Sequence, residues 1–133
     1  MRTIAANRPR ILRMAALLFA AAIVLSSSPV TAHAKAQYQW VCLGKFKIVY
    51  YTGDSTTASG KKTRENHTIA VDTDVISLGT KVRLGTKKAK KTYVAEDTGG
   101  SIQGNVIDVY VKKASQIPKC GVKYKKVWVR VKV

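Results

Sequence analysis

The chain has 133 residues, with 24 Lys and Arg against only seven Asp and Glu, and a formal net charge of +17 at pH 7. This length suffices for one small domain with a modest core and excludes two full-sized domains. The positive charge predicts association with polyanions such as nucleic acid, anionic lipid or the anionic polymers of a bacterial envelope, unless it serves solubility alone.

The N-terminal residues 1–34 have the three parts of a secretory signal peptide. Four arginines are followed by an uncharged apolar run at 14–25, and then by small residues at Ala32 and Ala34 that form an A-x-A cleavage pattern. The apolar run is shorter than the roughly 20 residues of a membrane-spanning helix, so cleavage is favoured over an uncleaved anchor. We therefore predict a secreted, extracellular or wall-associated protein without stable membrane insertion after cleavage.

Residues 35–133 are predicted to form the mature domain. The four arginines of the first 34 residues would leave with the signal and no acidic residue would, so the mature net charge would be +13. Outside the cell the abundant polyanion is the cell wall. We therefore expect attraction to anionic wall polymers and no nucleic-acid partner.

Apolar residues alternate with a period of two through much of the mature part, which indicates strands. The pattern is clearest in 126–133, where valines on one face alternate with Trp128, Arg130 and Lys132 on the other. Clusters of turn-forming residues separate the segments, and only 112–118 fits a helical turn. These features predict an all-β barrel or sandwich, with strands at 46–51, 67–72, 81–84, 91–97, 105–111 and 126–133.

Four aromatic residues are candidates either for binding a ligand or for packing within the fold. Trp40, Trp128, Tyr50 and Tyr51 are able to stack on sugar rings, although such side chains more often pack between strands. We predict Tyr51 as a substrate contact.

The two cysteines, Cys42 and Cys120, lie near the two ends of the mature part. An even count in an exported domain predicts one disulfide, with two free thiols as the alternative. Closing so long a loop would stabilise the domain by roughly 4 to 5 kcal/mol on the entropy model. Two cysteines and two widely spaced histidines are too few for a zinc site, and we expect no metal and no other cofactor.

Three aspartates stand out in this basic chain. Asp72 and Asp97 each end a predicted strand, and Asp108 interrupts an apolar strand between Ile107 and Val109. Carboxylates gathered in a partly desolvated groove raise one another's pKa, so that one of them serves as a general acid for glycosidic cleavage. The alternatives are structural: Asp97 in D-T-G-G caps a turn, and Asp72 with Asp74 binds a cation or backbone amides.

D-T-G is also the active-site triplet of aspartic proteases. Those proteases place apolar residues before the aspartate, where this chain has Glu96, and no partner motif follows. We therefore set the protease interpretation aside.

Four ordered blocks resemble the 3D domain family, named for its three aspartates. The blocks are TASG (57–60), IAVDTDVISLGTKV (69–82), YVAEDTGGSIQGNVIDVYV (93–111) and VWVRV (127–131). The resemblance spans about residues 50–131 and implies a small six-stranded double-psi β-barrel, similar to the catalytic domain of a membrane-bound lytic transglycosylase and to stationary-phase survival muralytic proteins. The family aspartates fall on Asp72, Asp97 and Asp108.

The resemblance also implies a reaction on the glycan strands of peptidoglycan. The aspartate at Asp108 would act as general acid and then general base at the bond between N-acetylmuramic acid and N-acetylglucosamine, leaving a 1,6-anhydromuramyl end. Asp97 would stabilise positive charge, and Asp72 would support the cleft. Motif loops that would line the sugar groove contribute Thr57, Ser59, Gly60, Thr98, Gly99 and Gly100.

Two departures from the family pattern occur. Ser77 stands where Pro is common, and Cys120-Gly121 replaces the usual Phe-Gly, which is consistent with a disulfide to Cys42. The alternative function is a non-catalytic, expansin-like module that binds cell-wall carbohydrate, with a cationic antimicrobial or inhibitor role as a third hypothesis.

Overall fold

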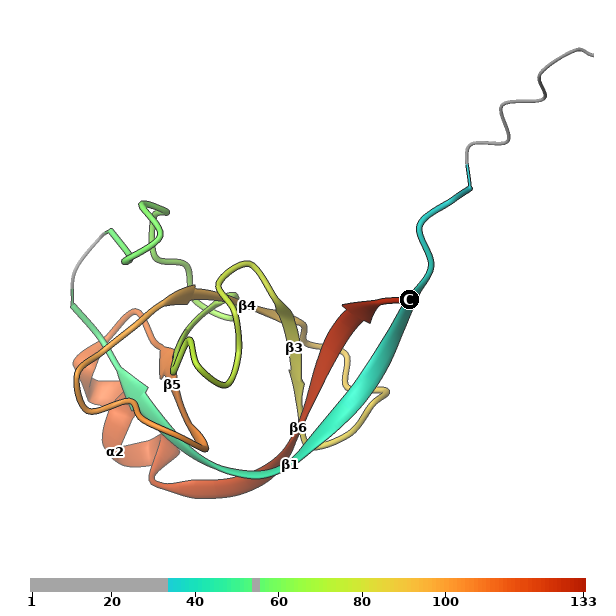
Figure 1. The fold of residues 1–133 in the computed structure, drawn as a ribbon. Coiled ribbons are helices and arrows are strands. Elements are labelled where there is room, and N and C mark those ends of the chain that lie inside the picture. Colours follow the sequence, from blue (N-terminus) through green and yellow to red (C-terminus); the bar gives the residue numbers. More distant parts are fainter. Residues whose placement is uncertain (1–33, 54–55) are drawn as a thin grey trace, which may run out of the picture. The chain divides into compact units, whose positions relative to one another are not determined.

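Six strands form the framework of the residues that this computed structural model describes, which are 34–53 and 56–133 (Figure 1). A 3₁₀ turn and one short helix complete it. The elements are β1 (Tyr38–Tyr51), β2 (Thr68–Val71), β3 (Lys81–Leu84), β4 (Tyr93–Asp97), β5 (Val106–Tyr110), η1 (Ala114–Gln116), α2 (Ile117–Cys120) and β6 (Lys123–Lys132).

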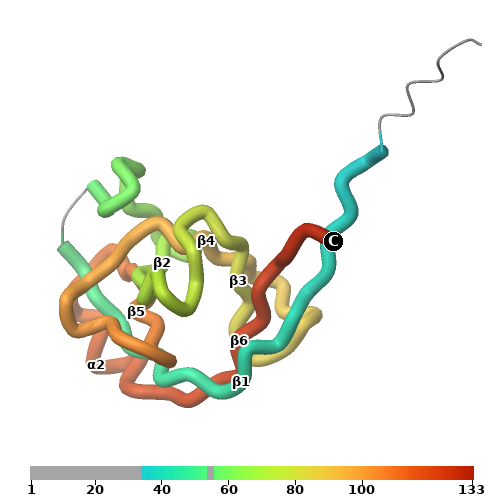
Figure 2. The backbone as a smooth tube through the Cα atoms, viewed as in Figure 1, coloured from blue at the N-terminus to red at the C-terminus, as the bar shows by residue number. Residues whose placement is uncertain are grey.

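The strands close a barrel in the order β1-β5-β2-β4-β3-β6, which confirms the predicted all-β fold with a small six-stranded barrel. β1 runs parallel to β5 and β2 runs parallel to β4, while the other neighbours are antiparallel. Figure 2 shows β1 and β6 following one another along their length. Closure leaves no free sheet edge, so every strand has two hydrogen-bonded neighbours.

Alternation along the strands separates a packed interior from a polar outer face. Ile69 and Val71 of β2 and Ile107 and Val109 of β5 all belong to the buried core. Asp108 therefore points away from the core, as the alternation predicts. The core cluster consists of Phe46, Ile48, Ile69, Val71, Ile76, Val82, Ala95, Ile107, Val109, Val127 and Val129.

β1 begins at Tyr38, well before the predicted start at residue 46. Its register against β6 shifts between Cys42 and Gly44, where Gly44 has a φ of +101°. A bulge interrupts the alternation on which strand prediction depends, and this explains the missed half of the strand. The predicted helical turn at 112–118 is present slightly later, at 114–120.

The predicted disulfide between Cys42 and Cys120 is wrong, because both cysteines are free. Cys120 lines a cavity together with Tyr50, at the far end of β1 from Cys42. Eight residues of extended strand span roughly 26 Å, whereas a disulfide needs Cα atoms within about 7 Å. Spacing in the sequence carried no information on this separation.

The predicted signal peptide at 1–34 falls, except for Ala34, on residues outside the described part of the chain. Within 34–53 and 56–133, no helix is both long and apolar enough to cross a membrane. Ala36–Val133 forms one compact unit, close to the predicted mature domain.

Candidate active site

A β-bulge at Glu96 sets the geometry of the carboxylates. Against β2, Ile69 is paired with Ala95 but Ala70 is paired with Asp97, so Glu96 is the extra residue of β4. A bulge of this kind re-aims the following side chain. Ordinary alternation would turn Asp97 toward the same side as the buried Ala95, and the bulge releases it from that pattern.

Asp97 and Asp108 flank one small residue. Ala70 of β2 is in register with Asp97 on one side and with Asp108 on the other. Two strand spacings place the Cα atoms of the aspartates roughly 10 Å apart. The side chains bring the two carboxylates closer together than this. Since Ala70 has only a methyl group, no large side chain separates the two carboxylates.

Asp97 is held by three hydrogen-bond donors. Its Oδ2 accepts a bond from the Tyr51 hydroxyl at 2.9 Å. Its Oδ1 accepts bonds from the backbone N–H groups of Ala58 and Thr98, each at 2.9 Å. The donors come from three separate segments, so the position of this carboxylate depends on the closed barrel and on the loop that follows β1.

Asp108 is held quite differently. Its side chain is half-buried, and its Oδ1 is fully buried without a hydrogen-bond partner among the described residues. Burial, and secondarily the negative charge of Asp97, raises the pKa of Asp108 to about 6. A fraction of the molecules therefore carries a proton on this carboxyl near neutral pH, as a general acid requires.

Tyr51, predicted as a substrate contact, lies against the carboxylate pair. Burial and the hydrogen bond to Asp97 raise the pKa of Tyr51, so it remains a protonated donor. Its ring meets the Tyr110 ring edge to face, with centroids 5.5 Å apart. The structure therefore places Tyr51 where it fixes Asp97.

Asp72 accepts hydrogen bonds from two backbone amides. Its Oδ2 accepts a bond from Gly104 N at 2.7 Å and its Oδ1 one from Asp74 N at 2.9 Å. These bonds, that of Gly104 first, lower the pKa of Asp72. The bond to Gly104 ties the end of β2 to the turn that precedes β5, and so supports the strand that carries Asp108.

The predicted D-T-G-G loop shares a groove with Asp72. Thr98, Gly99 and Gly100 are exposed and line it, with Gln103 on the same loop. The groove adjoins the aspartate pair through Thr98, whose N–H binds Asp97. The structure thus brings this loop next to the site, as the motif predicted.

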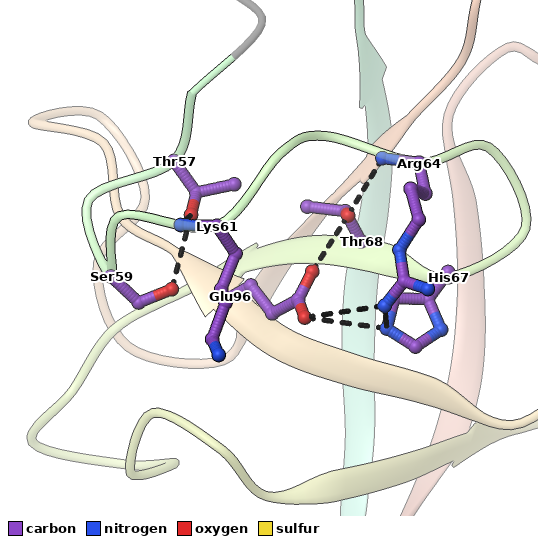
Figure 3. Close-up of polar contacts among 7 residues, drawn as sticks. All are labelled: Thr57, Ser59, Lys61, Arg64, His67, Thr68 and Glu96. Carbon is purple, nitrogen blue, oxygen red and sulfur yellow. Dashed lines mark hydrogen bonds and ion pairs between the residues drawn. The ribbon is translucent and has the colours of Figure 1, made fainter.

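The loop at 56–62 supplies the remaining predicted residues. Ser59 and Gly60 are exposed, whereas Thr57 is buried and its Oγ1 binds Lys61 N and the Ser59 hydroxyl at 3.0 Å each (Figure 3). The hydroxyl of Thr57 is therefore used to shape the loop. Ala58, which sequence reasoning missed, contributes the N–H that binds Asp97.

Sequence reasoning also missed the part played by Glu96. Its side chain is buried and accepts a bond from the Thr68 hydroxyl at 2.8 Å, while His67 and Arg64 contact its other oxygen at 3.3 and 3.8 Å (Figure 3). This cluster anchors the bulge that aims Asp97. The available signal was a second carboxylate directly before Asp97 in an otherwise apolar strand.

The described residues contain no group of three or more His, Cys, Asp or Glu side chains placed to hold a metal ion. The chemistry that this arrangement offers is proton transfer by Asp108 beside the negative charge of Asp97.

The family model described as the 3D domain matches residues 67–131. In sequence, the chain is 44% identical over 70 residues to the cell wall-binding protein YocH of Bacillus subtilis (strain 168), covering 50% of this chain and 23% of that protein.

Among solved structures, E. coli MltA with bound chitohexaose superimposes with a TM-score of 0.51 at 22% identity, over 59% of this chain and 28% of that chain. The apo-2 form of the E. coli lytic transglycosylase MltA gives a TM-score of 0.50 at 22% identity, over 59% of this chain and 27% of that chain. The chain thus spans less than a third of the length of these relatives, and the likeness to MltA shows a shared fold.

Proposed function

Because residues 67–131 belong to the 3D domain family, we propose that this protein cleaves the glycan strands of peptidoglycan as a lytic transglycosylase. The observation that carries the proposal is the buried, unpartnered Oδ1 of Asp108 beside the triply hydrogen-bonded Asp97. The fold shared with MltA, named a lytic transglycosylase, supports it. We also propose that residues 1–34 are a signal peptide, so that the mature domain works outside the cell.

The proposed reaction uses one acid and one neighbouring charge. Protonated Asp108 donates its proton to the oxygen that links C1 of N-acetylmuramic acid to N-acetylglucosamine, and the C1–O bond breaks. The negative charge of Asp97 stabilises the oxocarbenium-like centre. Ionised Asp108 then accepts the proton of the muramyl C6 hydroxyl, and the oxygen of that hydroxyl bonds to C1. This step leaves a 1,6-anhydro end and consumes no water.

The attacking hydroxyl belongs to the substrate itself, so proximity replaces a separate nucleophile. Exposed groups of the flanking loops are proposed to line the path of the sugar chain. Asp72 and Thr57 support these loops through backbone hydrogen bonds. The loop residues proposed to contact sugar are Ser59, Gly60, Thr98, Gly99 and Gly100.

Digestion of purified walls tests this function. The mature protein should release fragments with 1,6-anhydromuramyl ends, identified by mass, and Asp108→Asn should lower the rate by at least about 100-fold, as loss of a general acid does. Glu65→Gln, which removes an exposed carboxylate that does not line the groove beside the pair, is the matched control and should keep the rate. Hydrolysed ends, or full activity in Asp108→Asn, would refute the mechanism.

A second candidate is binding to the wall without cleavage. The observation in its favour is the relative named a cell wall-binding protein, which matches half of this chain. In that case wild type and Asp108→Asn would sediment equally with purified walls, and neither would release fragments.

A further inference from the structure

A second surface lies on the outer face of β1, β6 and β3, away from the carboxylates. Arg130 of β6 is in register with Trp40 of β1, and Trp128 of β6 with Arg83 of β3. Side chains in register on neighbouring strands share one face of a sheet. The alternating residues Val127 and Val129 are buried in the core, so the arginines and tryptophans face outward.

Aromatic rings hold both arginines in place. The guanidinium carbon of Arg83 lies 4.1 Å from the ring centroid of Trp40, and that of Arg130 lies 4.0 Å from the ring centroid of Tyr38. These distances are those of cation–π contacts, which orient the flat guanidinium group. We call Tyr38, Trp40, Arg83 and Arg130 the arginine–aromatic face.

The donors of this face are only partly used. Arg83 donates from Nε to the Thr92 hydroxyl at 3.2 Å and from Nη1 to the Lys87 carbonyl at 2.6 Å. A guanidinium has five N–H donors, so most of those on Arg83 are left uncommitted. Among the described residues, neither Arg83 nor Arg130 pairs with a carboxylate.

The surroundings carry charge of one sign. Residues 38–47, 81–91 and 119–133 contain 14 Lys and Arg and no Asp or Glu. Lys81 lines the same surface depression as the four residues of the arginine–aromatic face. The local field therefore attracts anions, and no neighbouring carboxylate competes for the two guanidinium groups.

We propose that the arginine–aromatic face binds a phosphodiester-linked polymer of the cell wall, of the polyol-phosphate class. Arginine edges form paired N–H···O bonds with phosphate. A neutral sugar is a poorer fit, because a guanidinium already covers one face of each stacked ring. The wall location rests on the proposed function, but this site is separate from the aspartate pair.

The spacing suits a chain with repeated charges. One strand step and two residues along β6 separate the Cα atoms of Arg83 and Arg130, which amounts to about 8 Å. Two phosphates of one flexible polymer can therefore be held at once. Once one phosphate is bound, binding of the second phosphate is intramolecular. The polymer is therefore bound more tightly than either contact alone would allow.

Titration of the mature protein with purified poly(glycerol phosphate) tests the site. The double variant Arg83→Gln/Arg130→Gln should weaken binding about 10-fold or more, and its affinity should depend less on salt. The control Lys119→Gln/Lys123→Gln removes the same charge from exposed positions outside the arginine–aromatic face and should weaken binding by no more than about 3-fold. Trp40→Leu keeps the charge but removes a ring, and should weaken binding several-fold.

Equal weakening in the arginine and lysine double variants would overturn the site in favour of diffuse charge attraction. Equal affinity for a single-stranded oligonucleotide of matched charge would overturn the assignment to a wall polymer, as would absence of binding by the wild type. Asp108→Asn should bind the polymer as the wild type does. Failure of wall cleavage with intact polymer binding would therefore refute only the proposed enzymatic function.

Discussion

The two halves of this barrel carry opposite charges in different environments. Across β2, β4 and β5, carboxylates lie against the sheet, where two backbone amides and a hydroxyl hold Asp97 and burial raises the pKa of Asp108. Across β3, β6 and the start of β1, cations stay near solvent and are oriented by aromatic rings. Desolvation raises the pKa of a carboxyl and prepares it for proton transfer, whereas a guanidinium stays charged and can bind an anion. One closed sheet thus carries a pair of neighbouring carboxylates on one side and two stacked arginines on the other.

After the loss of Asp108 itself, the largest effect is expected from replacing Asp97 in the carboxylate half. Asp97→Asn removes the charge that we propose stabilises the oxocarbenium-like centre, and should lower kcat/KM about 10- to 100-fold. It also removes the second cause of the raised pKa of Asp108. The protonated acid would then be lost at lower pH, so the alkaline limb of the pH profile of kcat/KM should move below its wild-type position near pH 6. An unmoved limb would contradict the coupling of the two aspartates.

The next prediction is that polymer binding by the arginines and glycan cleavage by the aspartates are independent of one another. Arg83→Gln/Arg130→Gln should bind poly(glycerol phosphate) about 10-fold less tightly, because two charge-assisted contacts are lost, yet cleave soluble glycan fragments within about 2-fold of the wild-type rate. Parallel measurements on fragments and on walls that retain their anionic polymers separate the two effects. A matching loss on soluble fragments would show that the arginines serve the cleavage site.

The burial of the Asp108 carboxylate should lower the free energy of unfolding, and replacement of Asp108 by Asn should restore it. The folded pKa of about 6 lies above the unfolded value near 3.8, so the penalty is absent below pH 3.8 and grows until the carboxyl is ionised above pH 6. Since the side chain is half-exposed, Asp108→Asn should gain about 1 to 2 kcal/mol in unfolding free energy at pH 8 and nothing at pH 3. Denaturant unfolding at both pH values measures this, and a loss of stability at pH 8 would contradict it.

The smallest effect is expected at the cysteines. Because both are free, Cys42→Ser/Cys120→Ser should change the unfolding free energy by less than about 1 kcal/mol, against the roughly 4 to 5 kcal/mol that a disulfide would contribute. Thermal unfolding with and without reductant gives the same comparison. A large drop on reduction would mean that the thiols pair after all.

Much of the fold was predictable from local pattern. Alternation in 105–111 and 126–133 placed the valines inside, and turn-forming clusters divided the strands correctly. The exception is the first half of β1, where the register shift between Cys42 and Gly44 breaks the alternation. Local pattern reports which face a residue takes only while the strand is regular.

By itself, the sequence determined the all-β class, the outward position of Asp108 and the Gly-rich loop beside Asp97, since each depends on neighbours in the chain. Only the tertiary structure decided which carboxylates lie beside one another. Asp97 and Asp108 meet across Ala70 because β4 and β5 flank β2 and a bulge re-aims Asp97. Asp72 instead binds Gly104, Cys42 and Cys120 are both free, and the two arginines stack on aromatic residues of another strand. These outcomes depend on strand order and register, which are set by contacts between residues distant in the chain.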